Sequence, residues 1–204
     1  MKTLIGIPCM ESIPTVTVKS LLSLRHNGVE FCFSMNSLVY DARNSIAKKA
    51  CEEGFDRVLW IDSDMVFEPD LYDRLSARLD EGYEFVTGLY FSRRMPILPI
   101  IYSDVFMQEK NGVQIPKSIE YADYPRDSFF EVKGCGFGGC MMTTKLLLDI
   151  ATKYGLPFSP VLGFGEDLSF CLKATEAMHK IYCDSSIKLG HMSHCIVQET
   201  DYVR

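Results

Sequence analysis

The stretch Arg57-Val58-Leu59-Trp60-Ile61-Asp62-Ser63-Asp64 joins a continuous apolar run to two carboxylates separated by one serine. An apolar run of this length is typical of a strand buried on both faces, as in a parallel sheet. Unpaired buried carboxylates are costly, so Asp62 and Asp64 need compensation where the strand ends. A divalent cation at the carboxyl edge of the sheet, where open α/β sheets bind ligands, would supply it. The alternative is an acidic turn that begins the next helix.

The composition is that of an ordinary globular protein. The chain has 204 residues, of which 47% are hydrophobic and 24% charged, so we expect one domain over residues 1–204. The net charge of −6 disfavours broad nonspecific binding to nucleic acid. No apolar segment approaches the ~20 residues that span a bilayer, and the first residues contain no signal-peptide core. The eight cysteines include no CxxC pair, which predicts a reduced, cytoplasmic protein without a zinc ribbon.

Apolar strands and amphipathic helices alternate along the first half of the chain. We expect strands at residues 3–8, 29–35, 58–61 and 84–91, and helices at 16–25, 41–53 and 69–82, the last with Pro69 in its first turn. This alternation favours parallel βαβ units and therefore an α/β fold, with a mostly parallel central sheet flanked by helices.

The second half follows a looser pattern. Residues 102–126 read as an irregular excursion or a hairpin with a turn at Asn111-Gly112. Beyond it we expect a strand at 129–132, a helix from Thr143 or Thr144 to Gly155, a helix at 166–178, and short strands at 180–183 and 187–189.

Two further polar clusters follow in this half. Glu166 and Asp167 stand after Gly163-Phe164-Gly165 in the first turn of the expected helix, where acids either cap the helix or act as a general base. His191 and His194 follow a short strand, as structural residues or as an imidazole completing a metal site. The glycine-rich residues 134–139 are not a dinucleotide fingerprint, and form either a substrate-lining backbone or a β-bulge. Arg93 and Arg94 either bind phosphate or face solvent.

The order of these pieces resembles the GT-A glycosyltransferases, with bacterial and phage members of the family 2 type as the nearest likeness. The resemblance rests on the strand that ends at Pro8, the Ala42-Arg43-Asn44 helix, the Asp62-Ser63-Asp64 motif, the Gly134-Cys135-Gly136-Phe137-Gly138-Gly139 run, the acidic helix start at 166–167 and Leu189-Gly190-His191. It extends over nearly the whole chain and implies a single Rossmann-like nucleotide-diphospho-sugar transferase domain.

The resemblance also implies roles for individual residues. Asp62 and Asp64, with Ser63 between them, match the DxD motif and would hold Mn²⁺ or Mg²⁺ on the donor diphosphate together with His191, for which His194 is a substitute. The residues expected around the nucleotide are Pro8, Glu11 and Arg43, and those expected beside the donor sugar and acceptor are Gly138 and Gly139. Asp167 matches the catalytic base of inverting members, and Glu166 lies beside it.

The implied activity is transfer of a single sugar from a nucleotide-sugar donor, with a UDP-sugar preferred, to an acceptor hydroxyl. The acceptor is a glycan, a lipid-linked molecule, a protein or a modified nucleobase. The chain lacks the Gln-x-x-Arg-Trp motif of processive members, which disfavours a polymerase. A retaining mechanism stays open. The alternatives are a nucleotidyltransferase of similar topology, which the Pro8-Cys9-Met10-Glu11 loop disfavours because it is neither glycine-rich nor basic, and a noncatalytic nucleotide-sugar-binding protein.

Overall fold

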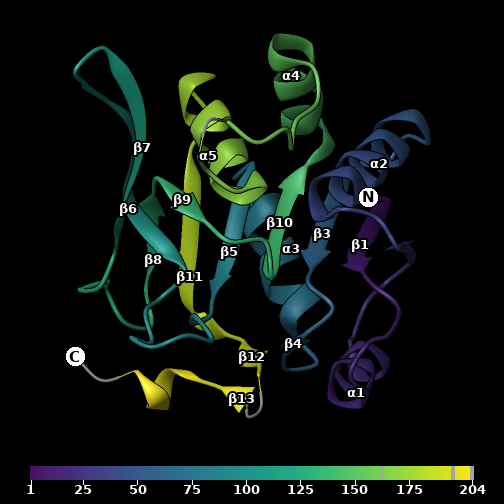
Figure 1. Ribbon diagram of the computed structural model, residues 1–204. Coiled ribbons are helices and arrows are strands. Elements are labelled where there is room, and N and C mark those ends of the chain that lie inside the picture. The colour runs from purple at the N-terminus through teal and green to yellow at the C-terminus, as the bar shows by residue number, and fades with distance from the viewer. Residues whose placement is uncertain (162, 194–195, 203–204) are drawn as a thin grey trace.

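A computed structural model describes residues 1–161, 163–193 and 196–202 (Figure 1). The helices are α1 (Thr15–Ser23), α2 (Val39–Glu52), α3 (Leu71–Asp80), α4 (Thr144–Tyr154) and α5 (Glu166–Glu176), with a short 3₁₀ turn at Glu199–Asp201. The strands are β1 (Thr3–Cys9), β2 (Val29–Met35), β3 (Arg57–Ile61), β4 (Met65–Val66), β5 (Phe85–Leu89), β6 (Ile101–Lys110), β7 (Val113–Glu120), β8 (Phe129–Val132), β9 (Gly134–Cys135), β10 (Gly139–Thr143), β11 (Ile181–Lys188), β12 (Gly190–Met192) and β13 (Ile196–Val197). Within the described residues, no helix is long and apolar enough to cross a membrane.

The centre of the fold is a seven-stranded sheet in the order β2-β1-β3-β10-β5-β11-β8. Strands β2, β1 and β3 pair in parallel, as do β5 and β11, whereas β10 and β8 run in the opposite direction. The predicted α/β class with a mostly parallel central sheet is therefore confirmed. The β3 strand, which carries the opening sequence motif, is buried along its whole length between β1 and β10.

The strands divide their side chains between two hydrophobic cores, one on each face of the sheet. Because successive side chains of a strand point to opposite faces, Val58 and Trp60 of β3 enter one core and Leu59 and Ile61 enter the other. Helices α2, α4 and α5 cover the first face, and α3 covers the second together with residues of α1 (Figure 1). Because helices cover both faces of the sheet, the run Val58 to Ile61 of β3 is apolar at every position.

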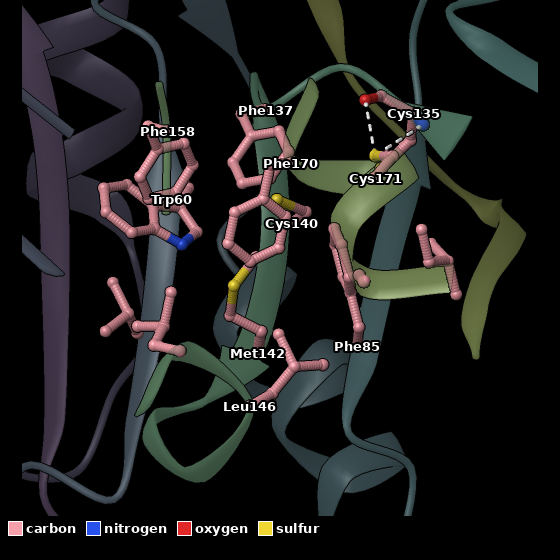
Figure 2. Close-up of a cluster of buried hydrophobic side chains, with 14 of the residues drawn as sticks. Trp60, Phe85, Cys135, Phe137, Cys140, Met142, Leu146, Phe158, Phe170 and Cys171 are labelled. Carbon is pink, nitrogen blue, oxygen red and sulfur yellow. Dashed lines mark hydrogen bonds between the residues drawn. The ribbon is translucent and has the colours of Figure 1, made fainter. Parts of the chain in front are cut away.

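An aromatic cluster fills the first core beneath the carboxyl edge of the sheet (Figure 2). Trp60 lies 5.1 Å from Phe158, which stacks on Phe170 of α5 at 4.7 Å between ring centroids. Phe137, from the glycine-rich segment, packs edge-on against Trp60 and Phe170. These ring contacts link β3, α5 and the segment before β10. The loops at this edge of the sheet are therefore packed on one aromatic cluster.

Three local expectations change in the structure. Residues 101–120 form a hairpin, β6 and β7, around the predicted Asn111-Gly112 turn, and it projects beyond the sheet (Figure 1). Pro69 lies outside the helix, which begins at Leu71, and the Pro69 carbonyl accepts a hydrogen bond from the Arg25 amide. The two short strands expected at 180–183 and 187–189 are one strand, β11, with a register shift after Asp184.

Candidate active site

A cavity of about 390 Å³ opens at the carboxyl edge of the sheet. Its wall collects most of the residues that the sequence singled out, from five separate segments of the chain. These residues are Pro8, Arg43, Asp62, Ser63, Asp64, Glu166, Asp167 and His191. The order of strands explains this, because β1 and β3 are parallel neighbours and their carboxyl ends meet at one edge.

A small second sheet brings His191 to Asp64. After Asp64 the chain enters β4, which pairs antiparallel with β12 and places His191 opposite Met65. The Nδ1 atom of His191 lies 2.8 Å from the Phe91 carbonyl, and since a carbonyl only accepts, Nδ1 carries the proton. The other nitrogen, Nε2, faces Asp64 with 3.6 Å to its Oδ2 atom. Metal-ligating histidines usually donate the N–H of their other ring nitrogen to a carbonyl or carboxylate, as Nδ1 does here.

Asp64 is also the partner of an arginine that lines the same cavity. The Arg93 Nη1 atom lies 2.5 Å from Asp64 Oδ2 and donates a second hydrogen bond to the Met192 carbonyl at 3.3 Å. Burial raises the pKa of Asp64, but His191 and Arg93 outweigh burial and hold that pKa below its usual value. Asp64 therefore remains ionised at neutral pH.

Asp62, the first acid of the motif, has a different partner. Arg43 from α2 is 2% exposed, donates from Nη2 to Asp62 Oδ1 at 2.7 Å, and from Nε to Glu166 Oε1 at 3.2 Å. Burial lowers the pKa of Arg43, but the two carboxylates outweigh it and the net pKa is raised. The guanidinium also lies over the Phe137 ring, 5.1 Å from its centroid. Arg43 thus joins the end of β3 to the start of α5.

We expect Arg43→Ala to lower the free energy of unfolding by about 3–5 kcal/mol, because it leaves Asp62 and Glu166 without their buried counter-charge. Arg25→Ala is the matched control, since Arg25 makes its ion pairs with Asp70 and Asp73 at a side-chain exposure of 63%. Exposed pairs contribute roughly 0–1 kcal/mol. Urea unfolding of both variants at pH 7.5 measures the difference, and equal losses would contradict the buried role of Arg43.

Asp167 has the most perturbed carboxyl group of the cavity. Burial, followed by the neighbouring charge of Glu166, raises the pKa of Asp167 to about 6. Its Oδ1 atom accepts a hydrogen bond from the Leu168 amide at 2.7 Å, which holds the side chain at the start of α5. A carboxyl group with a pKa near the operating pH, on the wall of a cavity, suits a general base.

Three of the predicted residues lie elsewhere. Glu11 is exposed on the loop after β1, and Gly138 and Gly139 are buried outside the cavity wall. A side chain at Gly138 would lie 2.9 Å from Met65 Sδ, and one at Gly139 would lie 2.3 Å from Leu189 Cδ2. Close packing therefore accounts for these glycines. His194, the substitute metal ligand, falls outside the described residues.

Several cavity residues were not predicted from the sequence. Tyr90 is buried against His191 with 5.4 Å between ring centroids, and its hydroxyl accepts a hydrogen bond from the Gly138 amide. Burial raises the pKa of Tyr90 well above its usual value, so it stays neutral. Ser37 also lines the cavity, and its buried hydroxyl has no hydrogen-bond partner within the described part of the chain. Both residues stand in unremarkable sequence, Tyr90 in an apolar run and Ser37 in a polar turn.

Asp64 and His191 are the two side chains of the cavity that suit a divalent cation. Residues 1–161, 163–193 and 196–202 contain no cluster of three or more His, Cys, Asp or Glu side chains arranged to hold a metal. Asp64 and His191 do face one another, and they offer one oxygen and one nitrogen, a combination that Mn²⁺ accepts. The third predicted ligand, Asp62, is bonded to Arg43. A cation here would need further oxygen ligands from a substrate or water.

Comparison with solved structures identifies the type of fold. The crystal structure of A197 from STIV superimposes with a TM-score of 0.68 at 23% identity, over 100% of this chain and 97% of that one. The crystal structure of GalNAc-T7 with UDP, GalNAc and Mn²⁺ follows at 0.64 and 10% identity, over 94% of this chain. The protein has a GT-A fold. S. aureus TarS 1-349, a glycosyltransferase like GalNAc-T7, shares this GT-A fold at 0.53 and 15% identity, over 90% of this chain.

The likeness to these solved structures is one of fold and is not visible in the sequence. The chain spans 44% of the GalNAc-T7 chain and 58% of the TarS chain, so it matches part of each. No protein-family model matches the sequence, and no curated protein matches it. At identities below 25%, the likeness establishes the GT-A fold alone.

Proposed function

We propose that this protein is a metal-dependent glycosyltransferase of the family 2 type, which transfers one sugar from a nucleotide-sugar donor to an acceptor hydroxyl. A UDP-sugar is the preferred donor, and inversion with Asp167 as base is the preferred mechanism. One domain over residues 1–204 would carry the activity. The known GT-A structure with UDP, GalNAc and Mn²⁺ supports the choice of donor class and metal.

A single observation carries this proposal. Asp64 and His191, which suit a cation, share one cavity with Asp167, which suits a base, although these residues come from three distant parts of the sequence. Sugar transfer from a nucleotide needs both functions within a few ångströms, because the leaving diphosphate and the attacking hydroxyl meet at one anomeric carbon. An acidic cluster with only a structural role would not require a cation site and a base in the same cavity.

The residues would divide the chemistry as follows. Asp64 and His191 would hold Mn²⁺ or Mg²⁺, which when bound offsets the negative charge of the departing nucleoside diphosphate. Asp62 would support the site through Arg43, and Ser63, Pro8 and the neighbouring backbone would border the nucleotide. The Asp167 carboxylate would take the proton of the acceptor hydroxyl while that oxygen attacks the anomeric carbon. The bond to the diphosphate breaks in the same displacement, and the anomeric configuration inverts.

The second candidate is a noncatalytic nucleotide-sugar-binding protein. The observation that favours it is the pairing of both motif carboxylates with arginines, Asp62 with Arg43 and Asp64 with Arg93. The raised pKa of Asp167 counts against it, since a binding protein gains nothing from a buried carboxyl group near its titration point.

We expect the purified protein to release the nucleoside diphosphate slowly from at least one donor in a panel of UDP-, GDP- and ADP-sugars, and only with Mn²⁺ or Mg²⁺ present. Water replaces the acceptor in this assay, so the acceptor need not be known. Luminescent detection of the released nucleotide, with EDTA as control, measures it. Donor binding without turnover would favour the binding protein, and turnover in EDTA would overturn the proposed metal.

A further inference from the structure

We propose that Arg93 is a removable counter-ion of Asp64, which must leave that carboxylate when a divalent cation binds and then pairs with the donor diphosphate. The inference rests on the proposed function, because it concerns the same cavity. Its consequence is that the cation binds weakly alone and strongly together with a diphosphate.

The first step is that Arg93 and a cation would compete for one oxygen atom. Arg93 Nη1 lies 2.5 Å from Asp64 Oδ2, and His191 Nε2 lies 3.6 Å from the same Oδ2. A cation ligated by Asp64 and His191 would have to approach this oxygen. A guanidinium and a divalent cation cannot share it closely, because their positive charges repel one another.

The second step is the contrast between the two arginines of the cavity. Arg43 is 2% exposed and bridges two carboxylates, so its release would strand buried charge. The side chain of Arg93 is 47% exposed and has only one carboxylate partner among the described residues. Releasing Arg93 into solvent costs little, since exposed ion pairs are weak. Arg93 is therefore suited to exchange, and Arg43 is suited to stay.

The third step is that the loop can stay in place while the side chain moves. Ser92 holds the backbone before and after Arg93: its amide donates to the Leu98 carbonyl at 2.8 Å, and its hydroxyl accepts from the Leu98 amide at 3.1 Å. The Ser92 hydroxyl also donates to the carbonyls of Arg94 and Pro96, at 3.0 and 3.2 Å. Rotation about the side-chain bonds of Arg93 is thus enough to release Asp64.

The fourth step is the new partner. Arg93 already lines the cavity, so its released guanidinium is within reach of a ligand bound there. A diphosphate bound to the cation would bring several anionic oxygens next to it, and the fork of an arginine matches phosphate geometry. Cation and diphosphate then favour one another through Arg93, and by linkage each raises the affinity for the other.

Two arginines of the same loop provide a matched test. Arg94 is exposed, and its side chain makes no hydrogen bond or ion pair within the described part of the chain. We would measure the affinity for Mn²⁺ by electron paramagnetic resonance, with and without UDP, in the native protein, Arg93→Ala, Arg93→Lys and Arg94→Ala. The ratio of the Mn²⁺ dissociation constants without and with UDP gives the coupling.

We expect Arg93→Ala to bind Mn²⁺ alone about 10-fold more tightly than the native protein, and to lose about 10-fold of the coupling with UDP. Arg94→Ala should match the native protein in both, and Arg93→Lys should lie between. Native-like Mn²⁺ affinity and coupling in Arg93→Ala would overturn the proposal while leaving the metal site intact. Absence of Mn²⁺ binding from every protein, with UDP present, would overturn the proposed metal dependence and the counter-ion role together.

Discussion

Asp167→Asn is expected to reduce sugar transfer about 10²–10⁴-fold, the usual contribution of a general base, while donor binding stays nearly native. The amide keeps the shape of the side chain and can still accept the hydrogen bond of the Leu168 amide, but it cannot take a proton. Initial rates with a responsive donor and titration of UDP by calorimetry separate the two effects. Unchanged transfer would move the base elsewhere.

The same variant should be more stable than the native protein at pH 7.5. The folded-state pKa of Asp167 lies at about 6, above its usual value of 3.8, so the folded state binds the proton more tightly. Its stabilising contribution is full below the unfolded pKa and is lost as pH rises through 6. Removing the charge should therefore add roughly 1–3 kcal/mol at pH 7.5. Asp41→Asn, which changes an acid in the first turn of α2, is the control for this gain in stability.

The activity of the native protein should fall as pH drops below about 6, because the Asp167 carboxylate is then protonated.

Asp64→Asn is expected to abolish metal-dependent release of the nucleoside diphosphate, with a loss on the order of 10²–10³-fold. The amide is a poor ligand for a hard cation, and the substitution removes one of the two protein ligands that face each other. Fold stability should change little, since the partner that is lost, Arg93, has a half-exposed side chain.

Mn²⁺ titration in the presence of UDP, alongside the rate assay, measures the effect of Asp64→Asn. Asp73→Asn is a suitable control, because Asp73 is an exposed carboxylate with an arginine partner outside the cavity. Full activity of Asp64→Asn, or equal activity with and without added metal, would show that the motif does not hold a cation.

The fold was predictable because its central strands carry a strong signal. β1, β3 and β5 are buried on both faces, and so their sequences are apolar at every position that packing requires. The hairpin gave a weak signal since most of β6 and β7 is exposed, which leaves no regular alternation to read. β11 was divided in two because Asp184 and Ser185 look like a polar break. In the structure both are buried, and they bond to Arg78 and to Ser128.

The sequence by itself determined which acids stand at the ends of elements, because a strand or helix boundary is a local property of the chain. Asp62, Asp64 and Asp167 could be singled out in that way. Only the tertiary structure decided what each of them meets. The β4–β12 pairing sets His191 beside Asp64, α2 carries Arg43 between Asp62 and Glu166, and the loop after β5 lays Arg93 on Asp64. Such partners are distant in sequence and close only once the sheet is ordered, so no local pattern encodes them.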